Sequence, residues 1–84
     1  MAYLVLLKSG AEKELERLPV KTHDRIVEHL ISLKDEPFPP GVKKLQGREG
    51  YRMRVGDYRI LYVVDNAKEK VEILSIAHRK EVYR

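Results

Sequence analysis

The feature that most constrains the fold is a pair of strand-like segments separated by a two-residue turn. Residues 51–55 alternate apolar side chains with arginines, residues 58–64 are mostly apolar, and only the dipeptide 56–57 (Gly-Asp) lies between them. Glycine at the first position of a two-residue loop is typical of a type II′ turn, which joins two antiparallel strands. Because the turn fixes the pairing, Arg54 is expected directly opposite Arg59.

The first half of the chain predicts a strand followed by two helices. Residues 2–7 are apolar at every position, which indicates a strand that is central in its sheet or covered on both faces. A helix begins at Ser9, which fits a capping box with Glu12, and Pro19 ends it at a tight turn. A second helix covers residues 20–34, and its apolar stripe consists of Ile26, Val27, Leu30, Ile31 and Leu33.

The second half of the chain predicts the rest of a sheet. Residues 35–41 contain three prolines and one glycine, and they form a loop. Residues 42–50 hold a short strand or a turn, residues 71–77 form the last strand, and residues 78–84 are a polar tail. The order β-α-α-β-β-β predicts one α+β domain over residues 1–84, with an N-terminal helical hairpin packed on a mostly antiparallel four-stranded sheet.

Composition excludes several kinds of site. The 84 residues include no cysteine, so the chain has no disulfide and no thiolate nucleophile or ligand. The spacing of His23, His29 and His78 does not favour a zinc site, and we expect no metal and no cofactor. The longest apolar run is too short to cross a bilayer, and the N-terminus lacks the pattern of a signal peptide. We therefore expect a cytoplasmic protein.

The positive charge is concentrated in the middle of the chain. The net charge is +4, and residues 37–63 alone contribute six basic and two acidic side chains. A clustered positive field favours a polyanion such as nucleic acid, but an ordinary solvated face of lysines and arginines has the same composition. The candidate RNA-binding residues in this segment are Lys43, Lys44 and Arg48.

Three arginines of the hairpin are expected on one face of the sheet. Arg52 and Arg54 alternate with apolar residues, and Arg59 returns opposite Arg54. Like charges that face each other across a strand pair are destabilising. The arrangement is explained either by a bound phosphate, whose oxygens match the guanidinium fork, or by two splayed and solvated side chains.

Two side chains after the last strand are further candidates. His78, which precedes Arg79, is either an ordinary strand-end histidine or a group that transfers a proton near neutral pH. Tyr83 is a core anchor, a stacking surface for a base or a proton donor.

Three stretches together resemble the RelE/ParE toxin superfamily. They are Lys44-Leu45-x-Gly47, Tyr51-Arg52-x-Arg54-Val55-Gly56-Asp57-Tyr58-Arg59-Ile60-x-Tyr62 and Ile76-x-His78-Arg79-x-x-x-Tyr83. More narrowly, the chain is similar to the RelE-type mRNA interferases of prokaryotic type II toxin–antitoxin modules. The resemblance covers essentially the whole chain, and residues 51–62 together with 78–83 are its most specific part.

The resemblance implies an enzyme that cuts mRNA in the ribosomal A site. In that reaction the ribose 2′-OH attacks the adjacent phosphate and a 5′-OH leaves, with basic side chains in place of a metal. By position, Arg52 and Arg54 match two basic sheet residues, and Arg59 matches the phosphate-binding arginine of the next strand. Arg79 matches the arginine after the last strand, and Tyr83 matches the tyrosine that stacks on a base.

The chain also departs from the family pattern. Arg52 and Arg54 stand where the prototype has lysines, and an arginine cannot act as a general base in a protein. They are therefore expected to neutralise phosphate charge, while proton transfer moves to His78, to Tyr83, or to the ribosome and substrate. The spacing from Arg79 to Tyr83 is shorter than in the prototype.

The same resemblance leaves two other functions open and implies partners. ParE-type relatives poison DNA gyrase and generally lack the full set of basic residues and tyrosine, and a relative with a decayed site would only bind its partner. A toxin of this kind implies a cognate RelB-like antitoxin in a hetero-oligomer, beside the ribosome and mRNA. We expect the antitoxin to dock in an apolar groove of the helical hairpin and to cover or distort the face that carries Arg52, Arg54 and Arg59.

Overall fold

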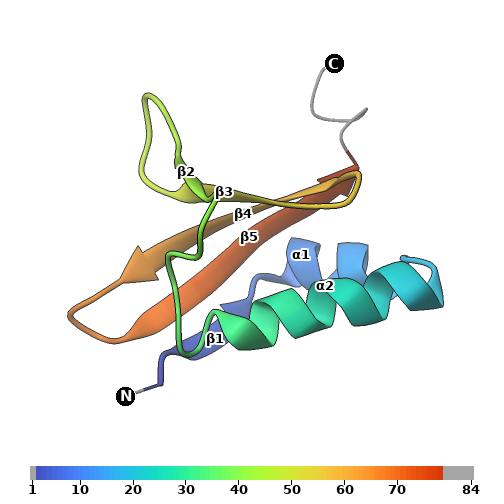
Figure 1. The fold of residues 1–84 in the computed structure, drawn as a ribbon, viewed down its shortest axis with the longest axis horizontal. Helices are drawn as coiled ribbons and strands as arrows, with labels where there is room; N and C mark the ends of the chain where they lie inside the picture. The colour runs from blue at the N-terminus through green and yellow to red at the C-terminus, as the bar shows by residue number, and fades with distance from the viewer. Residues whose placement is uncertain (1, 79–84) are drawn as a thin grey trace.

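The computed structural model describes residues 2–78, and its elements follow the expected order (Figure 1). They are β1 (Leu4–Leu7), α1 (Ser9–Glu16), α2 (Val20–Ser32), β2 (Lys43–Lys44), β3 (Tyr51–Val55), β4 (Tyr58–Asp65) and β5 (Lys70–His78). One five-stranded sheet has the order β1-β5-β4-β3-β2, and only the β1–β5 pair is parallel. The α+β class and the helical hairpin on a mostly antiparallel sheet are confirmed. No helix among the described residues is long and apolar enough to span a membrane.

The predicted count of four strands is wrong, because β2 adds a fifth strand at one edge. Lys43 pairs with Arg52 and Lys44 pairs with Tyr51, both antiparallel. Prolines before β2 and the positive φ angle of Gly47 after it confine the pairing to two residues. Such a short segment carries too little periodicity to be distinguished from a turn in the sequence.

The central hairpin has the register that the sequence predicts. Val55 pairs with Tyr58, and Arg54 lies directly opposite Arg59. Gly56 has a φ angle of +58°, which the first position of a type II′ turn requires. The two-residue loop therefore fixes which side chains of β3 and β4 share a face.

β1 does not have the environment predicted for it. The strand pairs only with β5 and forms an edge of the sheet. Val5 and Leu7 pack against the core, but Leu4 and Leu6 are 54% and 41% exposed. The reason is that both helices lie on one side of the sheet (Figure 1), so apolar residues of the opposite face have no cover.

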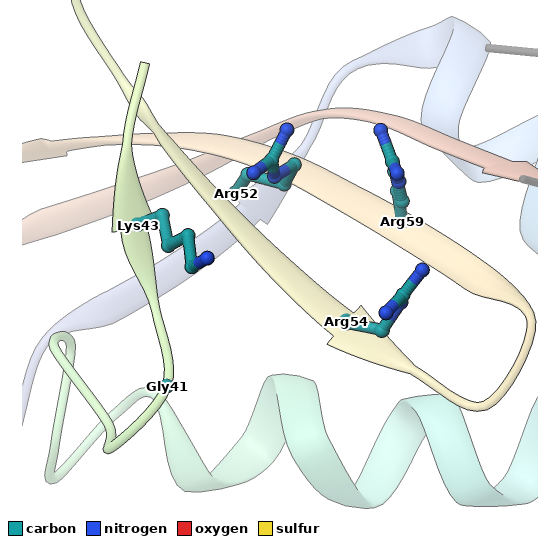
Figure 2. A pocket seen from close by; sticks show the side chains of 5 residues that line it. All are labelled: Gly41, Lys43, Arg52, Arg54 and Arg59. Atoms are coloured by element: carbon teal, nitrogen blue, oxygen red, sulfur yellow. The ribbon is translucent and has the colours of Figure 1, made fainter. Parts of the chain in front are cut away.

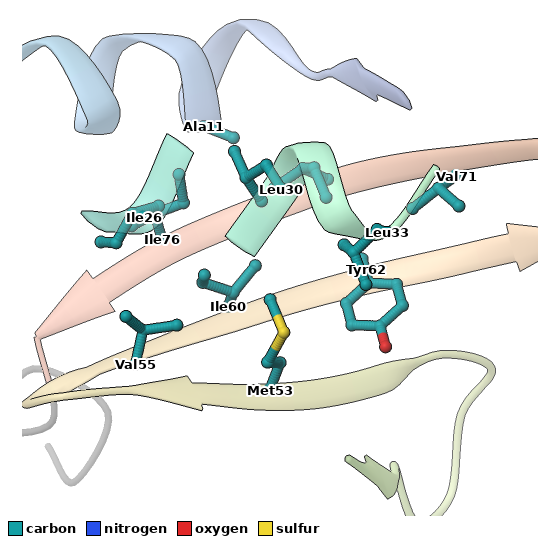
Figure 3. Packing of buried hydrophobic residues seen from close by; sticks show 11 residues of the cluster. Ala11, Ile26, Leu30, Leu33, Met53, Val55, Ile60, Tyr62, Val71 and Ile76 are labelled. Atoms are coloured by element: carbon teal, nitrogen blue, oxygen red, sulfur yellow. The ribbon is translucent and has the colours of Figure 1, made fainter. Parts of the chain in front are cut away.

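The core lies between the two helices and the near face of the sheet (Figure 3). Ile26, Leu30 and Leu33 are the buried members of the α2 stripe, whereas Ile31 is 53% exposed. The other buried core residues are Ala11, Met53, Val55, Ile60, Tyr62, Val71, Ile73 and Ile76. Alternate residues of β3 and β4 thus face the helices, and the intervening arginines face the other way.

The helix α1 begins at Ser9 as predicted, but the expected capping box is absent. Ser9 is already the first helical residue, and Lys8 occupies the N-cap position without a side-chain hydrogen bond. The Glu12 amide donates to the Lys8 carbonyl oxygen at 2.9 Å. Because Ser9 is not at the N-cap position, the expected capping box of Ser9 and Glu12 does not form.

A β-bulge in β5 decides which of its side chains face the helices. Ile73 and Ser75 have partners on β4, and Leu74 between them has none. The extra residue resets the alternation of the strand. As a result Ile76 enters the core, while Ala77 lies on the sheet face away from the helices, opposite an arginine.

Tyr62 ties the loop over residues 35–41 to β4. Its hydroxyl donates to the carbonyl oxygen of Pro37 at 2.9 Å. Its ring centroid lies 5.9 Å from that of Tyr51, which in turn meets Phe38 edge to face at 5.0 Å. Burial of the phenol, with an added effect of Tyr51, raises the pKa of Tyr62 to about 12. The hydroxyl therefore remains a donor well into the alkaline range.

We expect Tyr62→Phe to change both stability and its dependence on pH. Because the folded state raises the pKa from 10 to about 12, the wild type keeps its full Tyr62 contribution below pH 10 and loses it as the pH rises toward 12. At pH 8 the variant should be less stable by about 1 kcal/mol, since the Pro37 carbonyl loses its donor. Urea unfolding from pH 8 to 12 measures this. An equal alkaline loss of stability in both proteins would contradict the assignment.

Candidate functional site

Four cationic side chains surround one cavity on the sheet face away from the helices (Figure 2). We call this cavity of about 390 Å³ the arginine pocket, and it is lined by Gly41, Lys43, Arg52, Arg54 and Arg59. None of these lining residues is acidic. The pocket therefore concentrates positive charge and favours an anion.

The pairing of three strands brings the cations together. Arg54 is opposite Arg59 on β4, and Arg52 is opposite Lys43 on β2. Two like-charged cross-strand pairs thus lie side by side, and each is destabilising in the absence of a counter-charge. An oxyanion with several acceptors removes this repulsion and accepts hydrogen bonds from the guanidinium forks.

Lys43 reaches the pocket because the preceding loop is held in place. The loop over residues 35–41 is anchored by the hydrogen bond from Tyr62 to Pro37. Gly41 then adopts a φ angle of +87°, a conformation that favours glycine, and the chain turns into β2. The arginine pocket therefore gains a fourth cation, Lys43, from a segment outside the β3–β4 hairpin.

The other two candidate RNA-binding residues do not line the arginine pocket. Lys44 is exposed and pairs with Tyr51, so alternation directs it to the other face of the sheet. Arg48 lines a neighbouring cavity of about 190 Å³, which we call the apolar cavity. The residues around the apolar cavity are Leu45, Arg48, Arg52, Arg59, Leu61, Ser75 and Ala77.

His78 lies on the opposite side of the sheet from the arginine pocket. It pairs with Tyr58, and the two rings meet edge to face with their centroids 5.2 Å apart. Both side chains line a separate cavity of about 260 Å³, together with Glu14. Because Ala77 takes the place opposite Arg59, the structure does not bring His78 to the arginine pocket. Arg79 and Tyr83 lie outside the described residues.

One polar contact near the end of β5 has no signal in the sequence. β1 ends at Leu7, opposite Ile73, so β5 continues beyond its parallel partner. There the amide of Ile76 donates to a carboxylate oxygen of Glu14 at 2.9 Å. This bond supplies an acceptor for a backbone group at an otherwise open sheet edge and holds α1 against the end of the strand.

Within residues 2–78, no group of three or more His, Cys, Asp and Glu side chains is arranged to hold a metal ion.

Comparison with known proteins assigns the family. Residues 5–83 match a family model described as the ParE toxin of the type II toxin–antitoxin system parDE. Toxin RelE of Mycobacterium tuberculosis is 36% identical over 84 residues, covering 98% of this chain and 87% of that protein. Toxin RelG of the same bacterium is 33% identical over 86 residues, covering 100% of this chain and 99% of that protein.

A solved structure shows the same fold. It is the archaeal RelE–RelB complex from Pyrococcus horikoshii OT3, in which the matching chain is 34% identical with a TM-score of 0.85. The match covers 94% of this chain and 97% of that chain. These matches span most of the length of this chain and of each relative. The chain belongs to the RelE/ParE superfamily and is a RelE-like toxin of a type II toxin–antitoxin system.

Proposed function

We propose that this toxin is a ribosome-dependent endoribonuclease that acts in the cytoplasm, cuts mRNA in the ribosomal A site and so inhibits translation. The observation that carries the proposal is the arginine pocket, where three arginines and one lysine surround a cavity that has no acidic lining residue among residues 2–78. An RNA phosphate carries the negative charge that these cationic side chains favour. The relatives named RelE and RelG favour this activity over ParE-type inhibition of DNA gyrase.

The proposed reaction uses the cations to stabilise a negatively charged transition state. The 2′ oxygen of the ribose attacks the adjacent phosphorus, and the bond from phosphorus to the 5′ oxygen breaks. The products are a 2′,3′-cyclic phosphate and a 5′-OH. Negative charge grows on the non-bridging oxygens, where Arg52, Arg54 and Arg59 neutralise it. In this proposal the side-chain cations take the place of a metal ion.

Proton transfer requires a different group, because arginine stays protonated. Because His78 lies on the helix side of the sheet, the proposed candidates that remain are Tyr83 and the ribosome and substrate. Arg79 stays in the proposed site as a further phosphate contact, and Tyr83 as a group that stacks on a base or donates a proton.

We expect His78→Ala to retain cleavage within about tenfold of the wild type. The reason is that the His78 ring packs on Tyr58 on the helix side of the sheet, away from the arginine pocket. A general acid or base contributes about a hundredfold or more. Single-turnover cleavage of a defined mRNA on programmed ribosomes measures the change. A loss of about a hundredfold, with circular dichroism unchanged, would instead assign proton transfer to His78.

We further propose that a RelB-like antitoxin binds this toxin. The Pyrococcus horikoshii relative is part of a RelE–RelB complex. In this chain a cavity of about 210 Å³ lies beside α1, α2 and β1, lined by Val5, Leu7, Leu15, Val27, Leu30, Ile31 and Lys34. The cavity is mostly apolar and suits an apolar segment of the antitoxin. An antitoxin complex that leaves the arginine pocket open and active would contradict the expected inhibition.

The proposed cleavage is tested by the chemistry of its nucleophile. A defined mRNA is placed on ribosomes with a 2′-deoxyribose at the nucleotide before the cut, and a matched mRNA carries ribose there. We expect codon-phased cleavage of the ribose substrate only, with a 5′-OH on the downstream fragment. Cleavage of both substrates, or of neither in the presence of folded toxin, would contradict the proposal. In the second case a gyrase supercoiling assay tests the ParE-type activity.

A further inference from the structure

We propose that the apolar cavity binds one unpaired base of the RNA whose phosphate occupies the arginine pocket. This inference rests on the proposed function and names a second contact for the same substrate. The apolar cavity measures about 190 Å³ and lies on the sheet face away from the helices.

The floor and one wall of the apolar cavity are hydrocarbon. Leu61 of β4 and Ala77 of β5 form the floor, and Leu45 comes from the segment between β2 and β3. The Leu45 amide donates to the Gly50 carbonyl oxygen at 2.9 Å, which closes this segment into a short loop beside the sheet. The cavity is therefore shaped by backbone contacts of the fold.

The bulge in β5 places the remaining side chains. Ala77 pairs with Arg59 and Ser75 pairs with Leu61, so both lie on the cationic face. Without the extra residue at Leu74, the alternation from the buried Ile73 would direct Ser75 toward the helices. Bulges that re-aim side chains are found next to active sites. The hydroxyl of Ser75 is thus available at the rim for a polar edge of the ligand.

The two cavities share a wall, and this determines the class of ligand. Arg52 and Arg59 line both the arginine pocket and the apolar cavity, and Figure 2 shows both side chains rising from the sheet. A ligand that fills both cavities needs an anionic group linked to a flat group with apolar faces. A nucleotide has this composition, and bases stack on guanidinium planes, which Arg48 and Arg59 supply.

The expected effect follows from the energetics of stacking. Base stacking contributes about 1–3 kcal/mol per base, so removal of the base that occupies the apolar cavity should weaken binding by roughly tenfold. The probes are single-stranded trinucleotides with 2′-deoxyriboses, which lack the nucleophile and cannot be cut. Each is compared with versions that are abasic at one position, and NMR chemical-shift titration of the purified toxin gives the Kd values.

A matched pair of variants assigns the effect to the cavity. Ala77→Leu fills the apolar cavity, and Ala67→Leu makes the same change at an exposed turn between β4 and β5. We expect one abasic position to weaken binding to the wild type and to Ala67→Leu by about tenfold. In Ala77→Leu that difference should disappear, while the affinity for the abasic probe stays within about twofold.

The same titration separates the apolar cavity from Tyr83 and from the proposed cleavage. Tyr83→Ala should keep the base dependence at the position that Ala77→Leu abolishes. The proposal is overturned if the difference in Kd between intact and abasic probes vanishes in Tyr83→Ala and persists in Ala77→Leu. It is also overturned if the wild type binds all probes equally or binds none of them. So does an Ala77→Leu variant that loses only antitoxin binding, which would assign the cavity to a peptide side chain. If the toxin shows this base dependence but does not cleave mRNA on ribosomes, base binding by the apolar cavity is supported and the proposed nuclease function is contradicted.

Discussion

Replacing Arg54 or Arg59 with glutamine should lower ribosome-dependent mRNA cleavage by about a hundredfold each, the usual cost of removing one donor that stabilises transition-state charge. Glutamine keeps much of the side-chain length but removes the charge and the forked donor. The two arginines face each other across β3 and β4 and both line the arginine pocket. The measurement is single-turnover cleavage on programmed ribosomes.

Although it lowers cleavage, Arg54→Gln should not lower the stability of the fold. Because like charges directly across a strand pair are destabilising, Arg54→Gln should leave the free energy of unfolding unchanged or raise it by a few tenths of a kcal/mol. Arg25→Gln is the matched control, since Arg25 is an exposed arginine of α2 on the helix side of the sheet. Full activity in Arg54→Gln and Arg59→Gln, or equal losses in Arg25→Gln, would contradict a phosphate-binding role for the pocket.

Ile60→Ala should destabilise the protein by about 2–5 kcal/mol, because it removes buried methyl groups at the centre of the sheet and leaves a cavity. Ile60 is fully buried between Met53 on β3 and Ile76 on β5. A small domain has a total stability of about 5–15 kcal/mol, so this single change removes a large share of it. Urea unfolding monitored by circular dichroism measures the loss.

The neighbouring residue on the same strand provides the control. Leu61 points to the cationic face and is partly exposed. Leu61→Ala should therefore cost less than about 1.5 kcal/mol, since part of its surface is already in contact with water. Equal losses for Ile60→Ala and Leu61→Ala would mean that both faces of the sheet are packed, which would contradict a core confined to the helix side.

The hairpin was predictable because two kinds of local information agree. The dipeptide 56–57 limits the loop to two residues, and the alternation in residues 51–55 assigns each side chain to a face. Together they determine that Arg54 lies opposite Arg59, and the structure confirms this register. The central part of the candidate site is therefore readable from sequence.

Features that depend on distant parts of the chain were not predictable in the same way. The apolar residues of β1 fit a covered strand, but only the placement of both helices on one side decides that Leu4 and Leu6 stay exposed. β2 forms because Lys43 meets β3, and two residues carry no periodic signal. In both cases tertiary packing, and not the local sequence pattern, determines the exposure of the side chains or the presence of the strand.

The bulge in β5 explains why His78 does not lie near the arginines, where it was expected. The buried residues Val71, Ile73 and Ile76 are spaced by two and then by three, and this break in alternation is the one available signal. It shifts Ala77 to the cationic face and His78 to the helix face. The same shift builds the apolar cavity, which sequence reasoning did not anticipate.

If the cationic face binds mRNA for cleavage on the ribosome, primer extension should detect the cuts. A defined mRNA is incubated with purified toxin, with and without translating ribosomes, using the wild type, Arg54→Gln/Arg59→Gln and Arg79→Ala/Tyr83→Ala. We predict codon-phased cuts by the wild type only when ribosomes are present, and their loss in both double variants. Cuts that persist in folded Arg54→Gln/Arg59→Gln, or no cuts by folded wild type in either condition, would contradict it.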